Sequence, residues 1–107
     1  MIYPIRVTSA AWRDLKEIYD WITENDSLDK AGHVLDQLWE AVEGIADLPH
    51  RGSRPKELPL GTESEYRQVF FKPYRVIYEV RHDEVIIHLI ADGRRNLQSL
   101  LLRRLTG

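Results

Sequence analysis

The residues of this chain that are best suited to chemistry are arginines in its last third. Arg67 and Arg75 each lie near the start of a strand-like segment, and the pair Arg94-Arg95 directly follows a third such segment. Guanidinium groups held on a sheet bind phosphates and carboxylates well, because their donors match both in geometry and in charge. We therefore expect an anion-binding surface, either for nucleic acid or for a partner with acidic groups. Its possible further members are Lys72, Tyr74 and His88.

Arg75 also has a purely structural interpretation. Strand periodicity places it on the same face as Ile77 and Glu79, with Val76 and Tyr78 on the other face. A half-buried arginine needs a partner, so Arg75 could simply neutralise Glu79 or an acidic residue on a helix. Both interpretations remain open from the residues alone.

Few residues of the chain are candidates for metal binding, nucleophilic catalysis or cofactor binding. The sequence lacks the glycine pattern of a phosphate-binding loop, the HExxH zinc motif and the GxSxG nucleophile motif. It contains no cysteine, and its four histidines lie in four separate segments, so we expect no metal site and no cofactor. His88, inside a strand-like segment, is expected to be partly buried and hydrogen-bonded rather than a ligand or a catalytic base.

Charge is distributed unevenly along the 107 residues. Residues 1–50 hold four Lys/Arg against ten Asp/Glu, a balance of −6, whereas residues 51–107 hold eleven against seven, a balance of +4. The net charge of −2 is low for a protein that binds nucleic acid mainly through phosphates, so such binding would need a local patch. The length predicts one domain spanning 1–107, and the absence of cysteine and of a signal-like or membrane-spanning run predicts a cytoplasmic protein.

The first half of the chain predicts a strand followed by two helices. Residues 3–8 alternate like a strand, and Thr8 or Ser9 can cap the helix that follows. A second helix is predicted from about Leu28 to Pro49, and the short break between the helices predicts an antiparallel hairpin. The apolar residues at helical spacing are Ala11, Leu15, Ile18 and Ile22 in the first helix and Val34, Leu38, Ala41, Ile45 and Leu48 in the second.

The second half predicts a connector, three strands and a short helix. Residues 49–63 are rich in proline and glycine, and the strands that follow should turn at Lys72-Pro73 and at His82-Asp83. The C-terminal helix should dock on the sheet through Leu97, Leu100, Leu101 and Leu105. The predicted fold class is therefore α+β, in the order β-α-α-β-β-β-α, with the helical hairpin packed on one face of a small, mainly antiparallel sheet.

Over nearly its full length the chain resembles the RelE/ParE superfamily, the toxins of bacterial type II toxin–antitoxin pairs. The resemblance rests on the order and spacing of several elements. These are Val7-Thr8, the helix with Ala11, Asp14-Leu15, Ile18 and Trp21-Ile22, the helix ending at Leu48-Pro49, then Gly52, Tyr66-Arg67, Tyr74–Tyr78, and Val85–Ile90 with Arg94-Arg95. It implies a small toxin that forms a hetero-oligomer with a cognate antitoxin, whose C-terminal segment wraps around the toxin.

One branch of the superfamily, the RelE-like toxins, consists of ribosome-dependent endoribonucleases that cut messenger RNA with a cluster of Lys and Arg and a C-terminal Tyr or His. The arginines that match this cluster are Arg67, Arg75, and Arg94 or Arg95. Two groups are missing, because Val69 stands where a lysine is expected and Leu100 or Leu101 stands where the tyrosine is expected. His88 is then the remaining candidate for a general acid or base.

The other branch, the ParE-like toxins, lacks the nuclease set and poisons DNA gyrase by stabilising its cleaved-DNA state. The missing tyrosine and lysine, the long helical hairpin and the isoelectric point of about 6.1 favour this branch. The chain would then not be an enzyme, and Arg67, Tyr74, Arg75, Arg94 and Arg95 would be candidates for contacting the target or the antitoxin. A third alternative is a toxin that has lost its activity and acts only as an antitoxin-binding partner.

Overall fold

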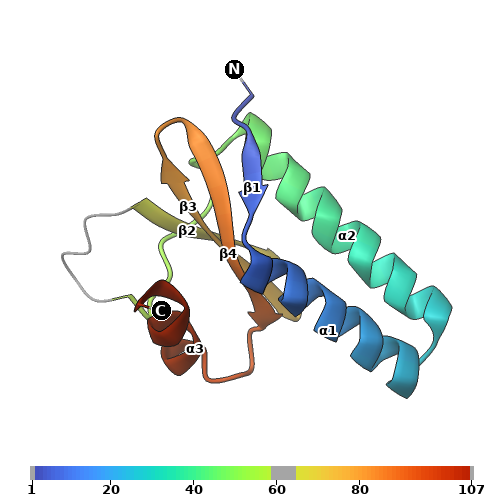
Figure 1. Ribbon diagram of the computed structural model, residues 1–107. Helices are drawn as coiled ribbons and strands as arrows, with labels where there is room; N and C mark the ends of the chain where they lie inside the picture. The colour runs from blue at the N-terminus through green and yellow to red at the C-terminus, as the bar shows by residue number, and fades with distance from the viewer. Residues whose placement is uncertain (1, 59–64, 107) are drawn as a thin grey trace.

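The computed structural model describes residues 2–58 and 65–106 and contains the seven predicted elements (Figure 1). Their order, β-α-α-β-β-β-α, confirms the predicted α+β fold class. The elements are β1 (Ile5–Val7), α1 (Ser9–Asn25), α2 (Leu28–Asp47), β2 (Glu65–Phe71), β3 (Tyr74–Arg81), β4 (Glu84–Asp92) and α3 (Leu97–Thr106).

The four strands form one sheet in the order β1-β4-β3-β2. Strand β1 runs parallel to β4, and the other two pairings are antiparallel, so the sheet is mainly antiparallel as predicted. The turns lie at Lys72-Pro73 and at His82-Asp83, where both residues have positive φ (50° and 61°). Two-residue hairpin turns favour this left-handed backbone because its twist matches that of the flanking strands.

The two long helices form the predicted hairpin on one face of the sheet. The hydroxyl of Thr8 accepts a hydrogen bond from the Ala11 amide at 3.1 Å, and Ser27 caps α2 through the Lys30 amide at 3.0 Å. Each cap satisfies an amide that the first helical turn leaves without a partner. The apolar faces of the hairpin and sheet form the main core, which includes Ala11, Leu15, Ile22, Val34, Leu38, Val42, Ile45, Val76, Tyr78, Val85, Ile87 and Ile90.

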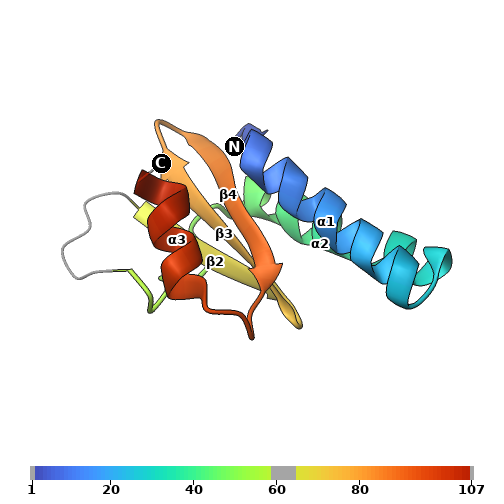
Figure 2. The same ribbon diagram turned by 60° about the horizontal axis from the view of Figure 1, so that its bottom comes forward.

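Helix α3 covers part of the opposite face of the sheet, which makes the fold a three-layer arrangement (Figure 2). Leu97 and Leu101 are 3% and 1% exposed and pack against Ile77, Leu89 and Ala91. Leu100 and Leu105 are partly buried beside them. The predicted docking of this helix through its leucines is therefore confirmed. Among the described residues, no helix is long and apolar enough to cross a membrane.

Candidate functional site

The guanidinium group of Arg75 is buried and occupied by partners from within the chain. Its Nη1 and Nη2 donate to the two carboxylate oxygens of Glu57 at 2.7 and 2.8 Å, and its Nε donates to Gln68 Oε1 at 2.8 Å. The Arg75 side chain is 9% exposed and that of Glu57 is 12% exposed. The hydrogen bond from Arg75 lowers the pKa of Glu57 below its ordinary value. The prediction that Arg75 would pair with Glu79 or with an acidic residue on a helix is wrong, because its partner Glu57 lies in the connector after α2.

Arg67 holds the start of the same connector onto strand β2. Its Nη1 donates to the carbonyl oxygens of His50 and Gly52 at 3.0 and 2.7 Å, and its Nε donates to Glu65 at 2.8 Å. The bond from Arg67 holds the pKa of Glu65 below its ordinary value. A Cβ atom at Gly52 would lie 2.4 Å from the Gln68 carbonyl oxygen, so only glycine fits where the connector crosses β2.

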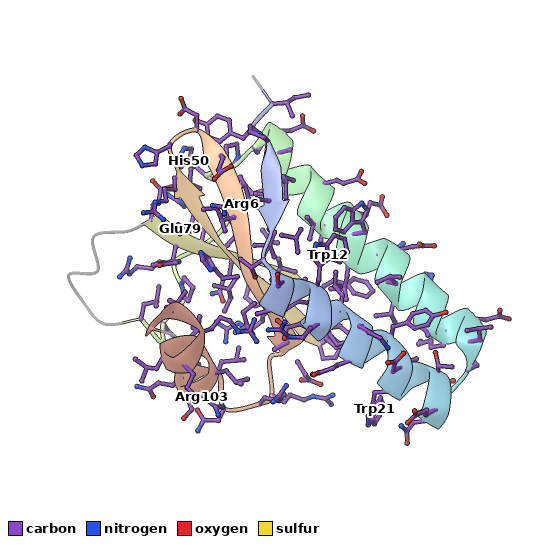
Figure 3. The ribbon with its side chains drawn as sticks, in the orientation of Figure 1. Arg6, Trp12, Trp21, His50, Glu79 and Arg103 are labelled. Carbon is purple, nitrogen blue, oxygen red and sulfur yellow. The ribbon has the colours of Figure 1, made fainter. Side chains whose placement is uncertain are left out.

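His88 lies in an irregular part of β4 and faces a buried carboxylate. Ile77 pairs with Leu89 and Tyr78 pairs with Ile87, so His88 is the extra residue of a β-bulge. Its Nε2 lies 2.9 Å from Oε1 of Glu79, which is 4% exposed and labelled in Figure 3. The Tyr66 ring packs against the imidazole in a T-shaped arrangement, with 5.7 Å between the ring centroids. The prediction that His88 is partly buried and hydrogen-bonded is confirmed.

The same bulge anchors an ion pair that joins α1 to α3. Arg104 donates to the two carboxylate oxygens of Asp14 at 2.8 and 3.0 Å and to the His88 carbonyl oxygen at 2.6 Å. Asp14 also accepts the backbone amide of Ile90 at 3.0 Å. Arg104 therefore pairs with a specific carboxylate on α1, and Asp14 faces the sheet and α3 rather than solvent. The spacing of residues in α1 could have indicated that Asp14 is partly buried, because it follows Ala11 by three residues and therefore lies on the same side of the helix.

Arg94, Arg95 and Tyr74 come together at the end of β4. Arg94 is 79% exposed and forms an ion pair with Asp92 at 2.5 Å, which lowers the pKa of Asp92. Within the described part of the chain, the Arg95 side chain forms no hydrogen bond or ion pair, and it is exposed. Burial raises the pKa of Tyr74. These three residues line one pocket of about 370 Å³ together with Trp21 and other residues of α1.

The predicted site residues therefore fall into separate groups rather than one cluster. Arg67 and Arg75 bind the connector, and His88 binds Glu79. Tyr74 lies with Arg94 and Arg95 in the pocket at the end of β4. A phosphate-stabilising guanidinium must have free donors, and those of Arg75 are already largely used. No group of three or more His, Asp or Glu within residues 2–58 and 65–106 is placed to hold a metal ion.

Solved structures that share this fold belong to toxins of toxin–antitoxin systems. The chromosomal ParDE system of P. aeruginosa gives a TM-score of 0.72 at 23% identity, covering 85% of this chain and 96% of that chain. The RelBE2 complex of Mycobacterium tuberculosis gives 0.61 at 22% identity, covering 86% and 92%. A mutant of E. coli toxin RelE in the free state gives 0.65 at 13% identity, covering 99% and 97%. The chain thus has the fold that these three structures share.

The amino-acid sequence identifies the family. Residues 5–97 match the sequence-family model described as the ParE toxin of the type II toxin–antitoxin system parDE. The chain therefore belongs to the ParE toxin family. Toxin ParE3 of Caulobacter vibrioides (strain ATCC 19089 / CIP 103742 / CB 15) is 27% identical over 88 residues, which cover 82% of this chain and 84% of that relative. The resemblance to toxins of type II toxin–antitoxin systems is confirmed.

Proposed function

We propose that this toxin arrests bacterial growth in the cytoplasm by poisoning DNA gyrase, and that a cognate antitoxin neutralises it. The observation that carries the proposal is the occupied guanidinium of Arg75, which donates to Glu57 and Gln68. In a RelE-like nuclease this arginine would have to stabilise the transition-state phosphate. The absence of a lysine at Val69 and of a tyrosine at Leu100 or Leu101 supports the same conclusion.

The neutralising partner should bind through apolar and acidic groups. Strand β2 is an edge of the sheet, and a pocket of about 630 Å³ between α2 and β2 includes Ala41, Val69 and Phe71 in its lining. Phe70 beside it is 53% exposed. A C-terminal antitoxin segment that folds on binding could bury such a surface. Its acidic side chains should reach Arg94 and Arg95, which are exposed, more readily than Arg67 or Arg75.

Assays with purified components distinguish the ParE-like activity on gyrase from the RelE-like cleavage of messenger RNA. The purified toxin should inhibit supercoiling by gyrase or trap cleaved DNA, and it should leave messenger RNA intact on translating ribosomes. Adding the antitoxin encoded beside it should restore supercoiling. Codon-linked cleavage of messenger RNA with gyrase unaffected would contradict the proposal. Unimpaired growth of cells that express the soluble toxin would instead favour a toxin that has lost its activity.

One observation favours the nuclease as the second candidate. The His88 imidazole is hydrogen-bonded to the Glu79 carboxylate, and its side chain remains 19% exposed. A histidine oriented by a carboxylate can act as a general base toward a ribose 2′-hydroxyl. If ribosome-dependent cleavage occurs, His88→Ala should abolish it, whereas inhibition of gyrase should not change in that variant.

A further inference from the structure

A second basic surface lies between α1 and α3, and it adjoins Arg95 from the arginines that the sequence singled out. We call it the α1–α3 groove, and it is an open pocket of about 500 Å³. The first turns of α1, the end of α3 and the bulge in β4 form its walls. Figure 3 labels Arg103, which α3 contributes. The lining residues are Thr8, Ala10, Arg13, His88, Leu100, Arg103 and Arg104.

The charges in this groove are only partly neutralised by the protein. Arg104 is bonded to Asp14, and His88 is bonded to Glu79. Arg13 and Arg103 are exposed, and neither side chain forms a hydrogen bond or ion pair with a residue that the structure describes. The groove therefore presents two guanidinium groups with all their donors available, held on two elements that the Asp14–Arg104 ion pair fixes relative to each other.

The basic surface extends toward the end of β4. An adjoining pocket of about 190 Å³ shares Ala10, Arg13 and Arg104 with the groove and adds Arg95, whose guanidinium is also available. This extension holds two acidic groups, Asp14 and Glu17. Asp14 is bonded to Arg104, so the acids that face the free arginines are Glu17 in the extension and Asp92, which interacts electrostatically with Arg95. Three available cations thus follow one groove in a protein whose net charge is −2.

We propose that the α1–α3 groove binds the phosphate backbone of a nucleic acid strand without reading its sequence. Arginine donors match phosphate oxygens in geometry and charge, and contacts of this kind position a protein on nucleic acid. An acidic peptide fits less well, because a segment that folds on binding must bury apolar surface and this lining offers little beyond Ala10 and Leu100. The inference goes beyond gyrase poisoning and does not depend on it.

Salt-dependent binding of a fluorescent oligothymidylate, followed by anisotropy, tests the proposal on the full chain. Three phosphate contacts to a single strand predict that log K falls with log salt with a slope of about −2, since each contact contributes about −0.7. The double variant Arg13→Gln/Arg103→Gln should reduce the slope to about −0.7 and weaken binding at least tenfold. The matched control, Lys30→Gln/Arg81→Gln, removes the same charge at exposed positions outside the groove and should bind like the wild type.

Three further measurements locate the ligand, test the folding of the variant and identify the class of ligand. The side-chain NMR signals of Arg13 and Arg103 should shift on addition of the oligonucleotide, while that of Arg81 should not. Equal melting temperatures of the double variant and the control would show that lost binding is not lost folding. An unchanged slope in the double variant, or no binding at low salt, would overturn the proposal. Tighter binding of a polyglutamate peptide to the same arginines would also overturn it, and would assign the groove to an acidic protein.

Discussion

The ion pair between Asp14 and Arg104 should be a principal link between the helical hairpin and α3. Its side chains are 12% and 21% exposed, and the two residues are 90 positions apart in sequence. Replacing Asp14 by alanine would leave Arg104 without its carboxylate and the Ile90 amide without its acceptor. The variant therefore removes one charged interaction and one backbone hydrogen bond at the same place.

The loss of folding stability in variants of Asp14 can be estimated from the burial of this ion pair. Removing one partner of a buried ion pair costs about 3–5 kcal/mol, and the remaining exposure of Arg104 allows partial rehydration, so we expect about 2–3 kcal/mol for Asp14→Ala. Asp14→Asn keeps an acceptor for the Ile90 amide and should cost about 1–2 kcal/mol. For a domain of this size, each kcal/mol lowers the melting temperature by about 4–8 °C.

Urea denaturation of a double-mutant cycle provides the assay. Asp14→Ala and Arg104→Ala should be coupled by about 1–3 kcal/mol, because each variant removes the partner of the other. Asp20→Asn is the control on the same helix; its pairing with Lys16 is exposed to solvent, so the stability of this variant should be close to that of the wild type. A coupling energy below about 0.5 kcal/mol, or an Asp14→Asn variant as stable as Asp20→Asn, would refute the role of this link.

Three further predictions concern the core, the pH dependence and toxicity. Leu101→Asp should lower the melting temperature strongly, because Leu101 is 1% exposed and the new charge would be buried. Deleting residues 97–107 should also lower it. Leu102→Asp, at a 51% exposed position, is the control, and equal melting temperatures of the two point variants would contradict the packing of α3. The pKa of Glu57 is lower in the folded than in the unfolded protein, so its ion pair with Arg75 stabilises the fold above pH 4.5, and this contribution is lost as the pH falls through the folded pKa. Glu57→Gln should therefore make the melting temperature less dependent on pH below 4.5, and an unchanged acid profile would argue against this role. Arg95→Ala should spare stability because the side chain is exposed, and it should reduce growth arrest; full toxicity would exclude Arg95 from the target surface.

The elements of the fold were predictable because their signals are local. The hydroxyl of Thr8 caps α1, the His82-Asp83 turn adopts the left-handed backbone, and the leucines of α3 recur at helical spacing. Each of these features depends on neighbours within about four residues along the chain. The order of the elements then followed from hydrophobic periodicity, since a helix and a strand bury different spacings of apolar residues.

The partners of the arginines were not predictable in the same way. Glu57 lies in a connector without periodicity, and its pairing with Arg75 depends on how that connector crosses β2 at Gly52. Arg104 meets Asp14 only because α1 and α3 approach the same bulge from different layers of the fold. Composition records that these charges exist, but tertiary contacts decide which of them neutralise one another.

This division of the arginines changes how the superfamily pattern should be interpreted. Arg67 and Arg75 occupy positions that a nuclease of the superfamily would use, yet here they hold the connector through carbonyl and carboxylate oxygens. The presence of these arginines in the sequence therefore does not distinguish the two branches, whereas the use of the Arg75 donors within the fold argues against the nuclease. The available cations of the α1–α3 groove and its extension are instead Arg13, Arg95 and Arg103. Variants at these three positions, rather than at Arg75, therefore separate loss of function from loss of fold.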